Sequence, residues 1–178
     1  MKLGVFDHMD RGQSPLDRFF EERLKLVEAY DEAGFYGYHV AEHHATPLGV
    51  APSPGVWLAA IAQRTKRLRF GPLVYLLPLY HPIKLLEEIC MLDQISGGRL
   101  LLGVGRGISP IELRFYGIDP EKAPGMYAEA LRKVERRKPS NVTSLPSPAP
   151  IVRKRLKPSE KPDIDPATLP GWARGKKA

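Results

Sequence analysis

The chain has 178 residues, 43% hydrophobic and 26% charged, with a formal net charge of +7 and a single cysteine, Cys90. This length and composition favour one globular domain, and a single cysteine excludes an intrachain disulfide, as is typical of reducing compartments. No apolar stretch is long enough to cross a membrane and the N-terminus lacks a signal-peptide pattern, so we expect a cytoplasmic protein without membrane partners.

The first part of the chain predicts two strand–helix units. Met1–Phe6 is an apolar run typical of a buried strand. Ser14-Pro15 predicts a helix N-terminus with Ser as the N-cap, and apolar residues at helical spacing follow until Gly34, which ends the helix. Tyr38–Ala41 predicts the second strand, and Ser53-Pro54 repeats the N-terminal signal for a second helix.

The next part predicts two further units. Leu68–Leu77 is an apolar run that predicts a third strand. Pro82 begins a helix that Gly97-Gly98 ends, and Leu100–Val104 predicts the fourth strand, followed by a short helical turn and a helix from Gly125 to about Arg137. Such alternation favours an α/β fold of parallel strands joined by right-handed crossovers. We expect one domain over residues 1–138.

The charge is concentrated in the last part of the chain. Residues 1–131 contain 14 Lys/Arg and 16 Asp/Glu, whereas residues 132–178 contain 13 Lys/Arg and 4 Asp/Glu, a net charge of +9. Residues 139–178 contain eight prolines and no apolar periodicity, so they cannot offset their ordering entropy. We expect a disordered basic tail, typical of a frameshifted or truncated reading frame, that attracts polyanions but recognises no specific nucleic acid.

Polar residues follow the ends of all four predicted strands. They are Asp7-His8, Glu42-His43-His44, Tyr80-His81 and Gly105-Arg106-Gly107. In a (β/α)₈ barrel the carboxyl ends of the strands form the catalytic face. Four consecutive units that bring His, Glu and Arg to one such face indicate an enzyme.

Six segments in order resemble bacterial luciferase and its flavin-dependent relatives: Ala41–His44, Arg64–Leu68, Leu77–Pro82, Leu92–Leu100, Gly103–Gly107 and Phe115–Asp119. The resemblance covers residues 1–131. It implies the N-terminal half of a TIM (β/α)₈ barrel, with four parallel strands and outer helices, because the four remaining units of the family are not visible. The resemblance therefore also implies that the activity of this chain is impaired.

The resemblance implies a monooxygenase that uses reduced FMN and O₂ on an aldehyde or similar small organic substrate. A separate flavin reductase would supply the reduced flavin, and the protein would form a homodimer or a heterodimer with a related subunit. Two alternatives stay open. One is an oxidoreductase that uses the deazaflavin F420, and the other is a non-catalytic subunit or remnant that pairs with a full-length relative.

The resemblance also implies site residues, and none of them is a metal ligand. His43 would be the catalytic base, with Glu42 and His44 in support, which agrees with the ability of imidazole to exchange protons near neutral pH. Arg106 would contact the flavin phosphate, where a guanidinium offers a planar pair of donors.

Two further features belong to the implied cofactor site. Gly105 would let the backbone approach the flavin beside Arg106. A cis peptide bond between Leu73 and Val74, in the third strand, would contribute to the flavin site in the same region of the sheet.

Overall fold

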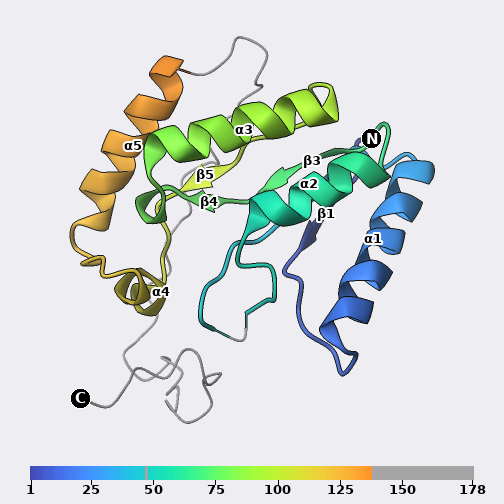
Figure 1. Cartoon of the computed structure of the whole chain (residues 1–178), viewed down its shortest axis with the longest axis horizontal. Helices are drawn as coiled ribbons and strands as arrows, with labels where there is room; N and C mark the ends of the chain where they lie inside the picture. Colours follow the sequence, from blue (N-terminus) through green and yellow to red (C-terminus); the bar gives the residue numbers. More distant parts are fainter. Residues whose placement is uncertain (47, 138–178) are drawn as a thin grey trace.

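A computed structural model describes residues 1–46 and 48–137 of the chain (Figure 1). The expected basic tail and the end of the expected domain at residue 138 lie outside the described residues. Strands and helices alternate in the order β1 (Gly4–Asp7), α1 (Leu16–Glu32), β2 (Gly37–Val40), α2 (Pro54–Arg64), β3 (Arg69–Pro72), β4 (Tyr75–Leu76), η1 (Leu77–Leu79), α3 (Pro82–Ser96), β5 (Val104–Gly105), α4 (Pro110–Phe115) and α5 (Ala123–Arg137).

All strand pairs are parallel, which confirms the expected α/β class. β1, β2 and β3 form one sheet in that order, with Tyr38 of β2 opposite Val5 and Phe70. β4 and β5 form a second sheet, and a single parallel bridge between Phe70 and Leu100 links the two sheets. The chain therefore arranges its four units as consecutive strands of a partial barrel.

The third strand differs from the prediction. The expected continuous strand over Leu68–Leu77 is wrong, because the chain forms two short strands, β3 and β4, on either side of Leu73 and Val74. These two residues are joined by the cis peptide bond that the resemblance implied. The parallel pairing with β2 extends to Pro72, and the pairing with β5 begins at Tyr75.

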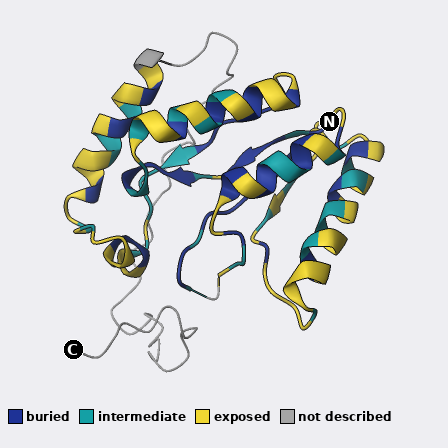
Figure 2. Ribbon diagram, viewed as in Figure 1, coloured by how far each residue is buried: buried dark blue, intermediate teal, exposed yellow. Residues whose placement is uncertain are grey.

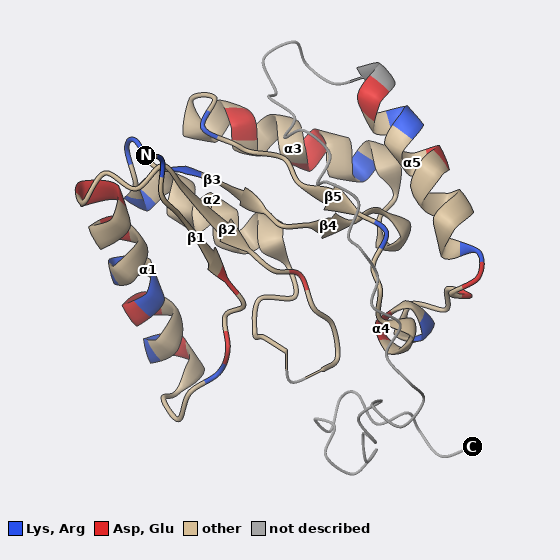
Figure 3. Cartoon of the chain, turned by 180° about the vertical axis from the view of Figure 1, so that it is seen from behind, with Lys and Arg blue, Asp and Glu red and all other residues tan. Residues whose placement is uncertain are grey.

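The helices cover one face of the strands. Figures 1 and 3 show α1, α2, α3 and α5 on the same side of the strands, and the opposite face carries no helix from the described residues. Figure 2 shows the buried surfaces of these helices turned toward the sheet. The core between them contains Tyr38, Val40, Leu58, Ile61, Phe70, Leu85 and Ile89, all at most 1% exposed.

Most helix termini follow the sequence signals, but α5 begins at Ala123 and not at the expected Gly125. Gly34 adopts a φ of 77°, and its N–H and that of Phe35 bond the carbonyls of Asp31 and Tyr30, the paired bonds of a Schellman motif. Ser14 is not the N-cap as expected, because α1 begins at Leu16 and Pro15 occupies the cap position without a side-chain bond. Proline preorganises this turn by its fixed φ, so no capping hydroxyl is needed.

Two polar groups, the buried Asp31 and the half-buried Arg99, fix the start of β3. The Asp31 carboxylate, at the end of α1, accepts the backbone N–H groups of Lys66, Arg67 and Leu68 at 2.8, 2.9 and 2.5 Å. The Arg99 guanidinium donates to the Thr65 hydroxyl at 2.7 Å and to the carbonyls of Ala62, Leu68 and Ser96. The Arg64–Leu68 and Leu92–Leu100 segments therefore have a structural reason for their residues.

Replacing Asp31 with asparagine is expected to lower the free energy of unfolding by about 2 kcal/mol, because a neutral amide accepts these N–H groups less well. Burial raises the pKa of Asp31, but the three N–H donors outweigh it and hold that pKa below its ordinary value. The stabilisation is complete above the ordinary aspartate pKa and is lost as the pH falls through the lowered one.

The difference between the two proteins in urea unfolding should therefore shrink between about pH 7 and about pH 3. Glu22→Gln is the matched control on the same helix, since Glu22 is about half exposed and pairs only with Arg18. It should change stability by less than about 0.5 kcal/mol. An Asp31→Asn variant as stable as the parent chain at neutral pH would contradict this role.

Candidate active site

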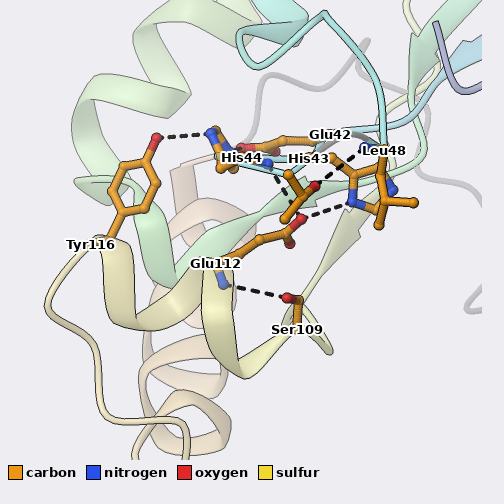
Figure 4. Close-up of polar contacts among 8 residues, drawn as sticks. Glu42, His43, His44, Leu48, Ser109, Glu112 and Tyr116 are labelled. Atoms are coloured by element: carbon orange, nitrogen blue, oxygen red, sulfur yellow. Dashed lines mark hydrogen bonds and ion pairs between the residues drawn. The ribbon is translucent and has the colours of Figure 1, made fainter. Parts of the chain in front are cut away.

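Three segments meet at the carboxyl end of the strands, and Figure 4 shows two of them, the residues after β2 and those of the α4 region. The residues after β2 bring Glu42, His43 and His44, the segment after β4 brings Tyr80, and the helix after β5, α4, brings two side chains toward the histidines. Glu42 is 3% exposed and His44 is 7% exposed. The consecutive residues Glu42, His43 and His44 thus contact side chains from elements far apart in sequence.

His44 is bonded at both ring nitrogens. Its Nε2 lies 2.7 Å from Oε1 of Glu42, and its Nδ1 lies 2.8 Å from the Tyr116 hydroxyl. The same Glu42 oxygen accepts the Tyr80 hydroxyl at 2.7 Å, and its other oxygen accepts the Leu76 N–H at 2.8 Å. An ionised carboxylate only accepts hydrogen bonds, so Nε2 carries the proton and Nδ1 accepts from Tyr116. Both ring nitrogens of His44 are therefore engaged in hydrogen bonds.

The hydroxyl protons of this network are firmly held. Burial, with the charge of Glu42, raises the pKa of Tyr80 far above its ordinary value. Burial also raises the pKa of Tyr116, and the charges of Glu42 and Glu112 add to the effect. Both tyrosines therefore act as donors across the accessible pH range.

His43 has a different environment. Its Nδ1 lies 3.0 Å from Oε1 of Glu112, while no residue of the described ranges bonds its Nε2. The hydrogen bond to Glu112 raises the pKa of His43 against the opposing effect of burial, and the charges of Glu42 and Asp10 raise it further. About a quarter of the side chain is exposed. His43 is thus the histidine of this pair with a nitrogen available to a ligand.

The residues expected at the cofactor lie on β4, β5 and the segments beside them. Arg106, directly after β5, is half-buried and forms no hydrogen bond or ion pair with the part of the chain that the structure describes. Leu73 is 37% exposed. A Cβ on Gly105 would lie 2.4 Å from Cγ2 of Val74. Gly105 therefore has a packing reason for its identity, apart from any contact with a cofactor.

These residues have the chemistry that FMN requires. A dianionic phosphate suits a guanidinium that has no carboxylate partner, and an isoalloxazine ring suits an exposed apolar side chain such as Leu73. Within residues 1–46 and 48–137 no group of three His, Cys, Asp or Glu could hold a metal ion. In the same ranges no helix combines the length and apolarity needed to span a bilayer.

Sequence reasoning did not select Glu112 or Tyr116 as site residues, and it named Tyr80 only among the polar residues that follow the strand ends. The available signal for Glu112 was the Ser109-Pro110 dipeptide three residues before it, which predicts a helix start with an acidic residue at its third position. Tyr116 follows Glu112 by four residues, so a helix places both on one face. Neither signal shows that this face meets the histidines after β2.

Comparison with known proteins decides the family. The model of the luciferase-like monooxygenases matches residues 1–144. The chain belongs to this family. Its fold is accordingly that of the luciferase-like TIM barrels, which confirms the resemblance read from the six segments.

Several relatives are oxygenases. The chain is 54% identical over 130 residues to protein y4wF of Sinorhizobium fredii, and 36% identical over 114 residues to the oxygenase component of the flavin-dependent trigonelline monooxygenase of Acinetobacter baylyi. These matches cover 73% and 63% of the chain. Among solved structures, the oxygenating constituent of 3,6-diketocamphane monooxygenase of Pseudomonas putida, in complex with FMN, superposes with a TM-score of 0.71 at 31% identity and covers 76% of the chain.

The luciferase-like chain spans less than half the length of these proteins. It covers 38% of y4wF, 32% of the trigonelline oxygenase and 38% of the diketocamphane enzyme. Solved F420-dependent enzymes also superpose, at 23% and 20% identity, and this likeness is to the fold alone.

Proposed function

We propose that this chain forms the catalytic face of a flavin-dependent monooxygenase in which His43 exchanges a proton with the substrate or cofactor. Reduced FMN would supply the electrons that activate O₂, and the oxidised compound would be an aldehyde or a similar small organic molecule. The observation that carries the proposal is a contrast at the carboxyl ends of the strands: Nε2 of His43 has no bond within the described residues, whereas both ring nitrogens of His44 are bonded. The FMN-bound diketocamphane enzyme supports the choice of cofactor.

Each residue of the network has a separate task in this proposal. Arg106 holds the FMN phosphate, and Leu73, Val74 and Gly105 line the apolar edge of the cofactor site. Glu42 holds His44 and the backbone of Leu76 in place through hydrogen bonds, so these residues beside His43 stay rigid. His43 accepts or returns a proton at Nε2, which requires a pKa near the working pH.

A flavin reductase and a second subunit are the proposed partners. The trigonelline relative is the oxygenase component of its system, which supports a separate reductase. The outer helices α2 and α3 expose apolar side chains, with Val56 at 74% and Met91 at 64% exposure. Burying such side chains against another subunit is favourable.

The exposed residues of α2 and α3 also favour a second candidate function, that of a non-catalytic subunit paired with a full-length relative. Size-exclusion chromatography coupled to light scattering tests both forms of association. A heterodimer with y4wF but no flavin binding would favour the non-catalytic subunit. A chain that remains monomeric alone and in the presence of y4wF would exclude it.

Changing Arg106 to alanine is expected to weaken FMN binding about 10–100-fold, because a charge-assisted pair with phosphate is removed. Riboflavin lacks the phosphate, so its affinity should be unchanged by the same substitution. The measurement is fluorescence titration of the 178-residue chain with each flavin, and anaerobic absorbance titration with their reduced forms.

Arg114→Ala is the matched control, since Arg114 is an exposed arginine of α4. It should leave both affinities unchanged. An equal loss of FMN and riboflavin affinity in Arg106→Ala would remove the phosphate role from Arg106. Tighter binding of F420 than of FMN by the parent chain would replace the proposed cofactor by a deazaflavin.

A further inference from the structure

The short helix α4 holds both histidines from one face. Glu112 and Tyr116 are four residues apart, and their side chains bond His43 and His44 respectively (Figure 4). Glu112 is 3% exposed, and its Oε1 also accepts the His44 N–H at 3.3 Å. A single helix turn after β5 therefore sets the positions of two residues that follow β2.

The carboxylate of Glu112 is directed away from its local helical partner. Ser109 is the N-cap of α4, and its hydroxyl accepts the Glu112 N–H at 3.3 Å, which is one half of a capping box. In the complete motif the acidic side chain at the third helical position returns to the N-cap N–H. Here that carboxylate bonds His43 and the His44 backbone instead. A local stabilising bond is thus exchanged for contacts with the histidines.

This geometry determines which nitrogen of His43 carries the proton. An ionised carboxylate only accepts hydrogen bonds, so the Nδ1 atom facing Glu112 must be protonated. In the neutral ring Nε2 is then the lone-pair acceptor. We propose that Glu112 is a positioning residue that keeps the proton on Nδ1 of His43 and presents Nε2 as the proton acceptor. This inference rests on the proposed function, since it deepens the role of His43 there.

The charged and titratable groups around His43 favour this arrangement. Glu112 faces it from α4, Glu42 from its own segment, and Asp10 and His8 from the segment after β1. The His8 ring stacks on His43 at a centroid distance of 5.9 Å. Among the carboxylates of the described residues, only Glu112 bonds the ring directly. Removing the Glu112 carboxylate should therefore change the tautomer and pKa of His43 more than removing any other of these carboxylates.

The test is ¹⁵N NMR of the histidine rings in the 178-residue chain as a function of pH. The Nδ1 and Nε2 shifts report the tautomer of the neutral ring, and their titration reports the pKa. We expect the parent chain to show His43 protonated at Nδ1, with a pKa above the ordinary histidine value. Glu112→Gln keeps an acceptor but no charge, so the tautomer should persist while the pKa falls. Glu112→Ala removes both, so the Nδ1–H preference should also be lost.

Two variants control for indirect effects. Tyr116→Phe should shift the His44 signals and leave the His43 tautomer unchanged, because Tyr116 bonds only the neighbouring ring. Glu129→Gln, on the exposed surface of α5, should change neither histidine. Circular dichroism confirms that each variant is folded, and if the alanine variant unfolds, the isosteric glutamine variant decides alone.

The inference is overturned if neutral His43 is protonated at Nε2 in the parent chain, or if Glu112→Gln leaves its pKa unchanged. These readings do not involve flavin. A chain that shows the expected tautomer but binds no FMN would contradict the proposed function and leave the placement of the proton intact. A chain that binds FMN with His43 in the other tautomer would contradict the placement of the proton and leave the proposed function intact.

Discussion

The His43→Ala variant is expected to oxygenate substrate about 10²–10⁴-fold more slowly than the parent protein, the usual contribution of a positioned acid or base. His43 is the histidine of the site whose Nε2 is unbonded within the described residues, and the adjacent His44 cannot replace it, because both nitrogens of His44 are bonded to Glu42 and Tyr116. Incorporation of ¹⁸O from ¹⁸O₂ into a panel of aldehydes, ketones and alkenes, with a separate NADH-dependent reductase supplying reduced flavin, measures the rate.

Because the chain covers 38% of y4wF, the assay is run on the 178-residue chain and on a fusion in which it replaces the matching part of y4wF. The fusion supplies the strands that would close the barrel. His81→Ala is the control, since His81 is an exposed residue before α3 and contributes only its backbone carbonyl to the helix. Equal ¹⁸O incorporation by His43→Ala and by the parent protein would remove His43 from the mechanism.

The rate of ¹⁸O incorporation should also depend on pH, in a direction that the environment of His43 determines. His43 must be neutral to accept a proton, and its hydrogen bond with Glu112 raises its pKa. The rate should therefore rise with pH through a pKa above the ordinary histidine value. In Glu112→Gln this acidic limb should move to lower pH, since the charge that stabilises the protonated ring is gone.

The second large effect concerns stability. Gly71→Ala is expected to lower the free energy of unfolding by about 3 kcal/mol, because a Cβ there would lie 1.7 Å from the Leu101 carbonyl oxygen. The contact is between backbones, and the Leu101 N–H already donates to the Phe70 carbonyl at 2.8 Å, so the two segments cannot separate without losing this bond. Urea unfolding followed by circular dichroism measures the change.

Gly125→Ala provides a control of opposite sign. A Cβ at Gly125 meets no atom within 4 Å, and the residue lies in α5. Alanine in a helix is favoured over glycine by about 0.5–1 kcal/mol, so this variant should be slightly more stable than the parent. If Gly71→Ala unfolds at the same urea concentration as the parent, the close approach of β3 to Leu101 is not required.

The sequence by itself determined the alternation of strands and helices and the ends of several helices. These features depend on neighbours in the chain. Glycine at position 34 or 97 ends a helix because it adopts positive φ, which the structure shows at 77° and 64°. Likewise, the carboxyl end of β2 places Glu42, His43 and His44 at the catalytic face once the strands are parallel.

Periodicity could not show that the third strand is divided. Leu68–Leu77 is almost uniformly apolar, so a change of backbone direction leaves no mark on the pattern. The cis peptide bond between Leu73 and Val74 was expected from the family resemblance and not from the periodicity. Whether β4 pairs with β5 or continues the ladder with β2 depends on the space that Gly103 and Gly105 leave beside Pro72 and Val74, which is a property of two strands together.

Only the tertiary structure decided how the two histidines differ. They are adjacent in sequence and identical in type, but Glu112 and Tyr116 reach them from 69 and 72 residues further along the chain. Hydrogen bonds over such separations depend on how the fourth unit packs against the second, and no local signal encodes that packing. The sequence places two imidazoles at a strand end, and within the described residues the fold bonds both nitrogens of His44 and one nitrogen of His43.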